Sequence, residues 1–284
     1  MADGAETIAD LIRRDMGRLT ATERRAAHAL LASYPVAGLE TVADFARRAN
    51  VSPPTILRFC ARLGFASYPE FQKTLRDELD AQLKSPLAKT SFVPGTPFDP
   101  DHFLAGFRNG VLDNINETFR HIPPGEFDAV VDLLAAPKRQ IGLIGGRFTD
   151  AIARYMGAHL RILRPDVFQF IGQFDNWRDQ LLDFGRKDVL ICFDVRRYQD
   201  DLLQIAERAV ADGITIVLFT DQWLSPIAAL ARHVLPARIA VPSNWDSSVA
   251  VLALVEAMLA ATTERLWSTA QDRLARLEKL RRHS

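Results

Sequence analysis

The sequence predicts an α + α/β protein, in which a helical N-terminal domain precedes an α/β sandwich with a mostly parallel sheet. The pattern up to residue 83 is helical almost throughout, whereas strand-like and helical runs alternate after residue 100. A stretch with four prolines and no sustained period, KSPLAKTSFVPGTPFDP, separates these halves. We therefore expect domains at 1–83 and 101–284, joined by a linker at 84–100.

Composition and charge place the chain among ordinary globular proteins. Its 284 residues exceed one typical domain, with 48% hydrophobic and 25% charged residues. Lys+Arg 35 and Asp+Glu 35 balance, so attraction to nucleic acid has to come from a local excess of cations. Cys60 and Cys192 stand in apolar patterns typical of buried thiols in a reducing compartment. There is no signal-peptide core and no apolar run near ~18 residues, so we expect a cytoplasmic protein without a membrane partner.

Capping signals divide the N-terminal half into short helices. Thr20 followed by Glu23 predicts a capping box at the start of one helix, which Pro35 ends. Thr41 is expected to cap the next helix, which ends near Ala49. Each of these helices therefore has a start that the sequence alone defines.

The segment TVADFARRANVSPPTILRFCARLGF, residues 41–65, has the form of a helix-turn-helix unit. Asn50 suits the left-handed turn, and Ser52 is expected to cap a second helix with proline in its first turn. That helix has a buried stripe at helical spacing, formed by Ile56, Phe59, Cys60 and Leu63. A different face carries Thr55, Arg58 and Arg62. Helices of this kind read base edges in the major groove of DNA.

The local charge favours a DNA-binding surface over this segment. Cations outnumber acids between residues 18 and 76, as phosphate contacts require. The alternative is a solvated helical bundle whose arginines bind nothing. We expect operator DNA to contact Thr41, Ser52, Pro53, Thr55, Arg58, Arg62, Ser67, Tyr68 and Lys73.

Strands and helices alternate in the C-terminal half. Apolar runs predict strands in RQIGLIGG, DVFQFIG, DVLICFDV, TIVLFTD and HVLPARIAV. The first four lack the polar alternation of a sheet with one wet face, which favours parallel strands buried on both sides. Helices are expected between most of them, at 150–163, 176–184, 199–212 and 225–231. Ligands of such folds bind outside the carboxyl ends of the strands.

The second helix of the helix-turn-helix unit, together with the segment after it, resembles the N-terminal domain of the RpiR family of bacterial transcription regulators. The resemblance rests on Val51, Ser52, Thr55, Arg58, Phe59, Leu63, Gly64, Phe65, Tyr68 and Phe71. It implies a DNA-binding domain followed by a sugar isomerase (SIS) domain, an α/β sandwich that binds phosphosugars. The pair Pro53-Pro54 departs from the family pattern and affects the expected base contacts at the start of that helix.

The phosphosugar cradle that the resemblance implies is altered here. The first loop, LIGGRFTD, keeps glycines and Thr149 but inserts Arg147 and Phe148, and DVRRYQDD replaces a loop rich in serine. Two guanidiniums and a tyrosine hydroxyl at a helix start favour a carboxylate or phosphate. Alternatively, Arg196 or Arg197 pairs with one of the aspartates Asp194, Asp200 and Asp201. Candidate effector contacts are Gly145, Gly146, Arg147, Thr149, Asp194, Arg196, Arg197, Tyr198, Thr220, Asp221 and Ser247.

Other C-terminal features leave alternatives open. Trp245 either lines the ligand pocket or packs in the core. The basic end STAQDRLARLEKLRRHS forms a helix on the body or on a partner subunit, or else a second DNA contact. The histidines show no metal-ligand spacing, so we expect neither a metal nor another cofactor.

These observations favour a transcriptional regulator that binds double-stranded operator DNA and senses a small anionic metabolite, a phosphosugar or a carboxylate. Such regulators usually present paired reading helices, so we expect a homodimer or homotetramer. One alternative is a DNA-binding protein whose SIS domain only dimerises. The other is a sugar-phosphate isomerase, for which Glu256 or His159 would have to act as base. Since the cradle is altered, we do not expect an enzyme.

Overall fold

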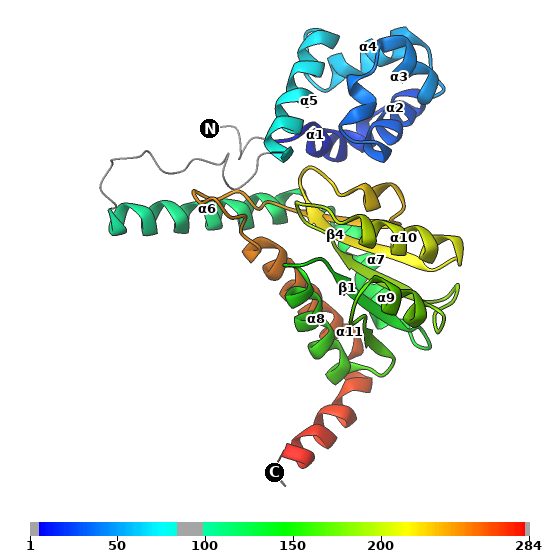
Figure 1. Cartoon of the computed structure of the whole chain (residues 1–284), viewed down its shortest axis with the longest axis vertical. Coiled ribbons are helices and arrows are strands. Elements are labelled where there is room, and N and C mark those ends of the chain that lie inside the picture. The colour runs from blue at the N-terminus through cyan, green and yellow to red at the C-terminus, as the bar shows by residue number, and fades with distance from the viewer. Residues whose placement is uncertain (1–5, 84–98, 282–284) are drawn as a thin grey trace.

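The computed structural model describes residues 6–83 and 99–281, and it confirms the predicted fold class. Figure 1 shows a cluster of short helices, coloured blue to cyan, above an α/β part coloured green to red. Nearly all of the linker expected at 84–100 lies outside the described residues. None of the described helices is long and apolar enough to cross a membrane.

The helical part is built around one apolar core. Its α-helices are α1 (Ile8–Asp15), α2 (Ala21–Ala32), α3 (Val42–Arg48), α4 (Pro53–Arg62) and α5 (Tyr68–Leu83). Thr20 and Glu23 form the predicted capping box at the start of α2, and Thr41 caps α3 as predicted. The core contains the predicted stripe of α4 together with Phe45 and Phe71.

The turn between α3 and α4 agrees with the prediction, except at the start of α4. Asn50 has a φ of 51°, which is the left-handed conformation expected of it. Ser52 occupies the cap position of α4, but its side chain makes no cap hydrogen bond to the helix. The Ser52 hydroxyl lies 3.0 Å from the Thr55 hydroxyl instead. The expected exposure of Thr55 is therefore wrong, because this contact and the packing of the first turn bury it.

The α/β part contains a parallel sheet of five strands within the described residues. The strands are β1 (Ile141–Gly145), β2 (Val167–Gln169), β3 (Val189–Phe193), β4 (Thr215–Asp221) and β5 (His233–Ala237). Their order is β2-β1-β3-β4-β5. Alternate residues enter two cores, so that Ile191 packs on one face and Cys192 on the other. Burial of both faces explains why the strands read as continuous apolar runs.

Helices cover both faces of the sheet. They are α6 (Pro100–His121), α7 (Pro124–Ala135), α8 (Asp150–Leu163), α9 (Phe174–Leu181), α10 (Asp200–Ala211) and α11 (Val249–Arg281). Helices α7, α8 and α11 share one apolar core, whereas α10 belongs to the other. The helix expected at 225–231 is instead a short 3-10 turn, η3 (Pro226–Ala229), and α9 begins and ends earlier than the expected 176–184.

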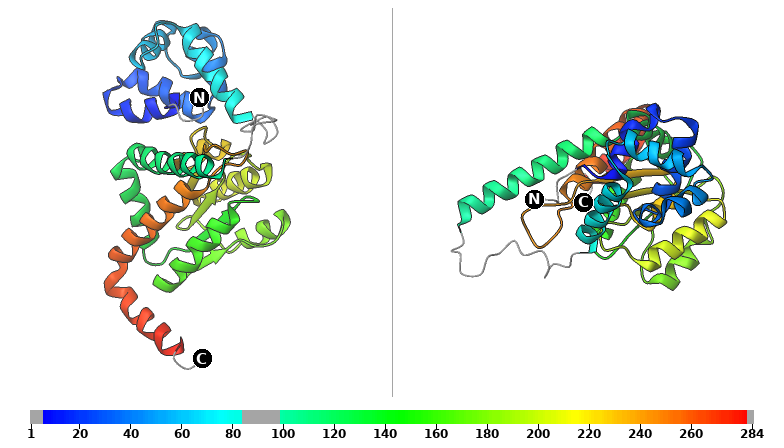
Figure 2. Two further views of the ribbon diagram at one scale, coloured as in Figure 1. Left: turned by 90° about the vertical axis from the view of Figure 1, so that its left-hand side faces the viewer. Right: turned by 90° about the horizontal axis from the view of Figure 1, so that it is seen from above.

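The helical part packs against the carboxyl-terminal edge of the sheet. Arg196 follows β3 and bonds to Ala81 on α5, while Arg238 follows β5 and bonds to Asp10 on α1. The left view of Figure 2, like Figure 1, shows α1–α5 together on one side of the α/β part. The edge at which parallel α/β sheets bind ligands therefore faces the helical part.

Candidate functional site

The second helix of the helix-turn-helix unit presents a solvent-facing surface at its start. Ser52, Pro53, Leu57 and Arg58 are exposed there, and Leu57 is 48% exposed although it is apolar. Arg58 donates to the Thr55 hydroxyl at 3.2 Å and has no acidic partner among the described residues. A guanidinium held over the start of a reading helix has the geometry needed for a base edge or a phosphate.

The other expected DNA contacts differ in how available they are. Lys73 is exposed and has no acidic partner in the described part of the chain, and Thr41 and Ser67 are also exposed. Arg62 is exposed but pairs with Glu23 across 3.1 Å. Tyr68 is buried, and its hydroxyl donates to the carbonyl oxygens of Gly38 and Glu40. Of the cations predicted to contact DNA, Arg58 and Lys73 are therefore exposed without an acidic partner among the described residues.

The α/β part has a cavity at the point where the strand order reverses. The order β2-β1-β3-β4-β5 places this switch point between β1 and β3, where doubly wound folds hold their ligands. The cavity has a volume of about 430 Å³. It is lined by Gly146, Arg147, Phe148, Thr149, Asp194, Val195, Arg196, Arg197, Gln199, Asn244, Trp245, Asp246 and Ser248.

Hydrogen bonds tie the loops after β1 and β3 to each other. The Thr149 hydroxyl donates to the carbonyl oxygen of Phe193 at 2.6 Å and accepts from the Gly146 backbone nitrogen at 2.8 Å. The Gln199 side chain accepts from the Arg147 backbone nitrogen at 2.8 Å. These two N–H groups are therefore occupied and are not available to an anion.

Glycine at position 145 permits this tight turn. A β-carbon there would lie 2.6 Å from the backbone nitrogen of Asp150, which is closer than such contacts allow. The helix α8 can therefore start directly behind β1. Gly145 shapes the loop although it does not line the cavity.

Two cations and two aromatic rings form the open side of the cavity. Arg147 and Arg197 are exposed, and neither has an acidic partner among the described residues. The Arg147 guanidinium lies 5.2 Å from the centroid of the Phe148 ring, which contacts Trp245 edge to face. Trp245 is 62% exposed, so its alternative as a core residue is wrong. Unpaired guanidiniums beside an apolar wall suit a ligand that is both anionic and partly apolar.

Asp194 is a buried acid on the floor of the cavity. Its Oδ2 accepts from the Ser225 hydroxyl, while its Oδ1 is buried without a hydrogen-bond partner in the described structure. Burial, with a smaller contribution from Asp221, raises the pKa of the Asp194 carboxyl to about 7. This carboxyl therefore changes charge near neutral pH.

Arg196 lines the same cavity but is committed to protein partners. Its side chain is 2% exposed and lies 3.3 Å from a carboxylate oxygen of Asp246. Its Nη1 donates to the carbonyl oxygen of Ala81 at 2.8 Å, and its guanidinium stacks 4.8 Å from the Trp223 ring centroid. The alternative prediction, in which Arg196 pairs with Asp194, Asp200 or Asp201, is wrong. Asp246 neutralises it because the loop after β5 folds back over the β3 loop.

The remaining expected effector contacts support the cavity from behind. The buried Asp221 accepts from the Arg196 backbone nitrogen at 2.6 Å and from the Tyr198 hydroxyl at 2.8 Å. The Thr220 hydroxyl accepts from the Ser225 backbone nitrogen, and the Ser247 hydroxyl from the Val249 backbone nitrogen. None of these side chains lines the cavity. They hold its loops in place.

Sequence reasoning missed several residues of the cavity wall. These are Val195, Gln199, Asn244, Asp246 and Ser248. Asp246 was visible beside Trp245 in a polar stretch between a strand and a long helix. Its pairing with Arg196 depends on two loops far apart in sequence, and no local pattern predicts that.

The other hollow and the other candidate residues give less support for a ligand site than the switch-point cavity does. A larger and more open hollow of about 650 Å³ lies between α9 and α10, but its Arg178 and Arg208 each pair with a neighbouring aspartate. Glu256 accepts from the Tyr155 hydroxyl and, like His159, lies outside the switch-point cavity. Among the residues that the structure describes, no group of His, Cys, Asp and Glu gathers to hold a metal ion.

Comparison with known proteins agrees with this two-part arrangement. Residues 6–82 match the helix-turn-helix domain of the rpiR family, and residues 134–261 match the SIS domain. The HTH-type transcriptional regulator HexR of Escherichia coli is 23% identical over 289 residues, which cover 96% of this chain and 93% of that protein. Similarity thus extends over both parts.

Two solved structures share the fold. The sugar isomerase domain of an RpiR transcription factor from Sphaerobacter thermophilus is 25% identical, with a TM-score of 0.57, and covers 62% of this chain and 97% of its own. The Vibrio vulnificus NanR protein, complexed with ManNAc-6P, is 18% identical, with a TM-score of 0.55, over 96% of this chain and 97% of its own. The second covers both parts of the molecule.

Proposed function

Because the chain belongs to the RpiR family of transcriptional regulators, with a helix-turn-helix domain and a SIS domain, we propose that a small anionic metabolite in the switch-point cavity controls its binding to DNA. One observation carries the proposal. Arg147 and Arg197 border the cavity without acidic partners among the described residues. Unpaired guanidiniums at a ligand-binding edge are favourable contacts for a phosphate or a carboxylate.

The rest of the cavity narrows the chemistry of the ligand. The rings of Phe148 and Trp245 offer an apolar surface, and the Asp194 carboxyl lines the same cavity, where it would accept a hydrogen bond from a hydroxyl or an amine. A phosphosugar or a hydroxylated carboxylic acid has all three features. The fold also occurs in NanR, whose structure contains a phosphosugar. We therefore expect the effector to belong to one of these two classes.

A thermal-shift panel tests this proposal. Full-length protein is heated with inorganic phosphate, sulfate, hexose 6-phosphates and hydroxy acids, at constant ionic strength. Since a ligand that binds only the folded state raises Tm, at least one organic anion should stabilise the wild type. The stabilisation should be lost in Arg147→Ala and Arg197→Ala. It should persist in Arg265→Ala, whose arginine pairs with Asp132 far from the cavity. Equal stabilisation of all four proteins would overturn the proposal.

The DNA-binding part of the proposal rests on Arg58 of α4 and Lys73 of α5. Exposed Arg58 and Lys73 would contact base edges or phosphates of an operator, and specific regulators usually place two such helices about 34 Å apart on the duplex. We therefore propose a homodimer or homotetramer and a near-palindromic operator. Light scattering with DNA present checks this, and a monomer bound to specific DNA at micromolar concentration would contradict it.

The alternative of an isomerase finds little support. Glu256 and His159, the candidate bases, lie on α11 and α8 and do not line the switch-point cavity. Asp194 does line it. The described lining contains one further acid, Asp246, which pairs with Arg196. Turnover of a hexose 6-phosphate by the purified protein would revive this alternative.

A further inference from the structure

Two buried arginines join the helical part to the loops that form the ligand cavity. One is Arg238, which follows β5 and reaches α1. The other is Arg196, which follows β3 and reaches α5. Both lie at the carboxyl edge of the sheet, and each bonds to a different helix of the DNA-binding part. We call these two contacts the interdomain joints.

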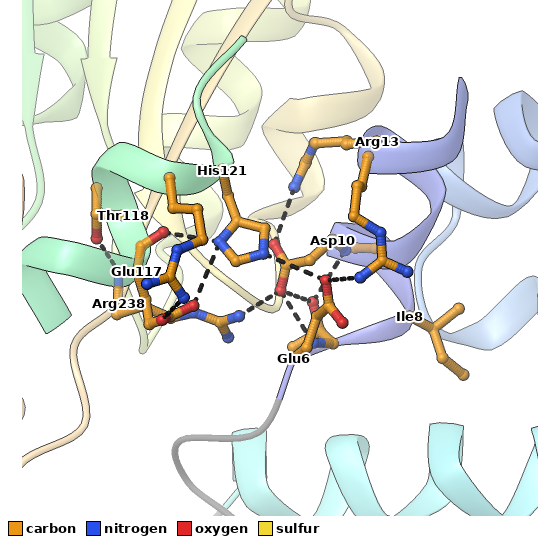
Figure 3. Close-up of polar contacts among 12 residues, drawn as sticks. Glu6, Ile8, Asp10, Arg13, Glu117, Thr118, His121 and Arg238 are labelled. Carbon is orange, nitrogen blue, oxygen red and sulfur yellow. Dashed lines mark hydrogen bonds and ion pairs between the residues drawn. The ribbon is translucent and has the colours of Figure 1, made fainter. Parts of the chain in front are cut away.

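The joint of Arg238 is a buried ion pair. Its guanidinium lies 2.6 Å from a carboxylate oxygen of Asp10, and the two side chains are 6% and 3% exposed. Asp10 also accepts from the Thr7 backbone nitrogen and hydroxyl, and its own backbone nitrogen donates to that hydroxyl, which completes the capping box of α1. The Arg238 backbone nitrogen donates to the hydroxyl of Thr118 on α6. Figure 3 shows these contacts converging between the two parts.

The joint of Arg196 meets the end of a helix. The carbonyl oxygen of Ala81 lies in the last turn of α5, where the helix dipole is negative. The same guanidinium pairs with Asp246 in the cavity wall. One side chain therefore contacts both the DNA-binding part and the cavity.

The two joints are connected through the loop after β5. This loop begins at Arg238 and continues to Asn244, Trp245 and Asp246, which line the cavity. A backbone hydrogen bond of 2.8 Å from Ser247 to Ile239 holds its two ends together. A ligand that moves the cavity end of the loop therefore acts on the joint at its other end.

Exposed contacts between the two parts are weaker. Glu6 on the N-terminal side lies 3.3 Å from the Nε2 atom of His121 on α6, and Glu6 is partly exposed (Figure 3). Such pairs contribute little to stability in water. Apolar packing also joins the parts, because Ala81 of α5 belongs to the apolar core of the α/β part and α2 contacts η3. Arg196 and Arg238 add buried charged contacts to this packing.

We propose that the interdomain joints are closed in the ligand-free protein and that an anion in the cavity opens them. The anion competes with Asp246 and the Ala81 carbonyl for Arg196, because charged bidentate contacts are stronger than a bond to a neutral carbonyl. Loss of the Arg196 joint and displacement of the loop after β5 free α1–α5 to change orientation. The coupling rests on the proposed function, since it needs a ligand in that cavity, whereas the joints themselves do not.

Hydrogen exchange of the full chain tests the joints without any ligand. Arg238→Met and Asp10→Asn both remove the buried ion pair, and Asn keeps an acceptor for the cap of α1. We expect the amides of α1 and of the last turn of α5 to exchange about tenfold faster in both variants, since a charged hydrogen bond is lost. Arg265→Ala, which breaks an ion pair inside the α/β part, should leave these amides unchanged. If these amides of α1 and α5 exchanged as slowly in a folded Asp10→Asn protein as in the wild type, the proposal would be overturned.

A ligand arm separates this coupling from the proposed function. Inorganic phosphate is added to the wild type, and its binding is measured by calorimetry. If phosphate binds, the same amides of α1 and α5 should exchange faster, and the variants should already show that rate without it. Binding without a change at these amides would refute the coupling but leave an anion site in the cavity. If phosphate does not bind, the proposed function loses support, and the two variants alone decide whether the Arg238 joint holds α1 in place.

Discussion

The two parts of the molecule use cationic side chains in opposite ways. On the helical part, Arg58 and Lys73 are exposed and lack acidic partners among the described residues. In the α/β part, Arg196 and Arg238 are buried, and each is bonded to the helical part. The exposed cations are available to a polyanion, whereas the buried ones hold two bodies together. Exposure and pairing, more than residue type, therefore separate a binding contact from an interdomain contact.

The largest effect is expected where a buried cation is removed. Arg238→Met removes the nearer of two cations beside the buried Asp10 carboxylate and leaves Arg13 at 3.9 Å, so the free energy of unfolding should fall by up to about 3–5 kcal/mol. Replacing both members, as Asp10→Asn with Arg238→Met, should restore part of this loss, because no charge is left unpaired and Asn keeps an acceptor for the Thr7 backbone nitrogen. Chemical denaturation of the full chain measures all three proteins. A loss below about 1 kcal/mol, the value typical of exposed pairs, would show that the pair is not a buried joint.

Removal of an exposed cation should change DNA binding and leave stability nearly unchanged. Arg58→Ala should weaken binding to a duplex selected by the protein by about 1–3 kcal/mol if Arg58 contacts a base edge. Fluorescence anisotropy measures the affinity, and Arg108→Ala, an exposed cation on α6, serves as the matched control. Equal affinities of the two variants would show that the start of α4 does not read DNA.

The pH dependence of anion binding tests the floor of the cavity. The pKa of Asp194 is raised to about 7 by burial, so the carboxyl is mostly protonated below that pH and ionised above it. An ionised carboxylate repels an anion, so affinity should fall by up to about tenfold per pH unit above 7. Calorimetry with sulfate, which does not titrate in this range, measures the slope. The slope should flatten in Asp194→Asn. A slope of equal size in the variant would assign the pH dependence to another group.

The smallest effect is expected at a single phosphate contact. Lys73→Ala should weaken binding to all DNA sequences alike and reduce the salt dependence of log K by about one unit of slope. Titrations at several salt concentrations, with selected and random duplexes, distinguish this from Arg58→Ala. If Lys73→Ala changed only the affinity for the selected duplex, it would belong with the base-reading contacts.

Periodicity made the elements of both parts predictable. The stripe of Ile56 and Phe59 on α4, the left-handed turn at Asn50 and the strand β4 are encoded in local patterns, and the structure has each of them. Thr55 is an exception because a side-chain contact with Ser52 in the first turn buries it. At helix ends, side-chain contacts of this kind can override the exposure that the sequence pattern predicts.

The cavity could be located from the sequence but not fully assembled. Since ligands of parallel sheets bind at strand ends, the loops with Arg147 and Arg197 could be identified from the sequence. The partners of Arg196 could not, because Ala81 and Asp246 come from distant segments that only the packed fold brings together. Closeness in sequence favoured Asp194 as a partner of Arg196, but Asp194 bonds to Ser225 in the structure. Long-range pairing of this kind carries no signal in spacing.

The central claim is that an anion held by Arg147 and Arg197 changes the affinity of α4 for DNA. Its most direct test is the affinity for a selected duplex, measured with and without the organic anion that gives the largest thermal shift, at constant ionic strength so that general screening is equal. We expect this anion to change the Kd of the wild type by about tenfold, a coupling in the usual range for allosteric proteins. The double variant Arg147→Ala/Arg197→Ala should keep the ligand-free Kd and show no response. An unchanged Kd in the wild type with bound anion, or the same response in the double variant, would contradict the account.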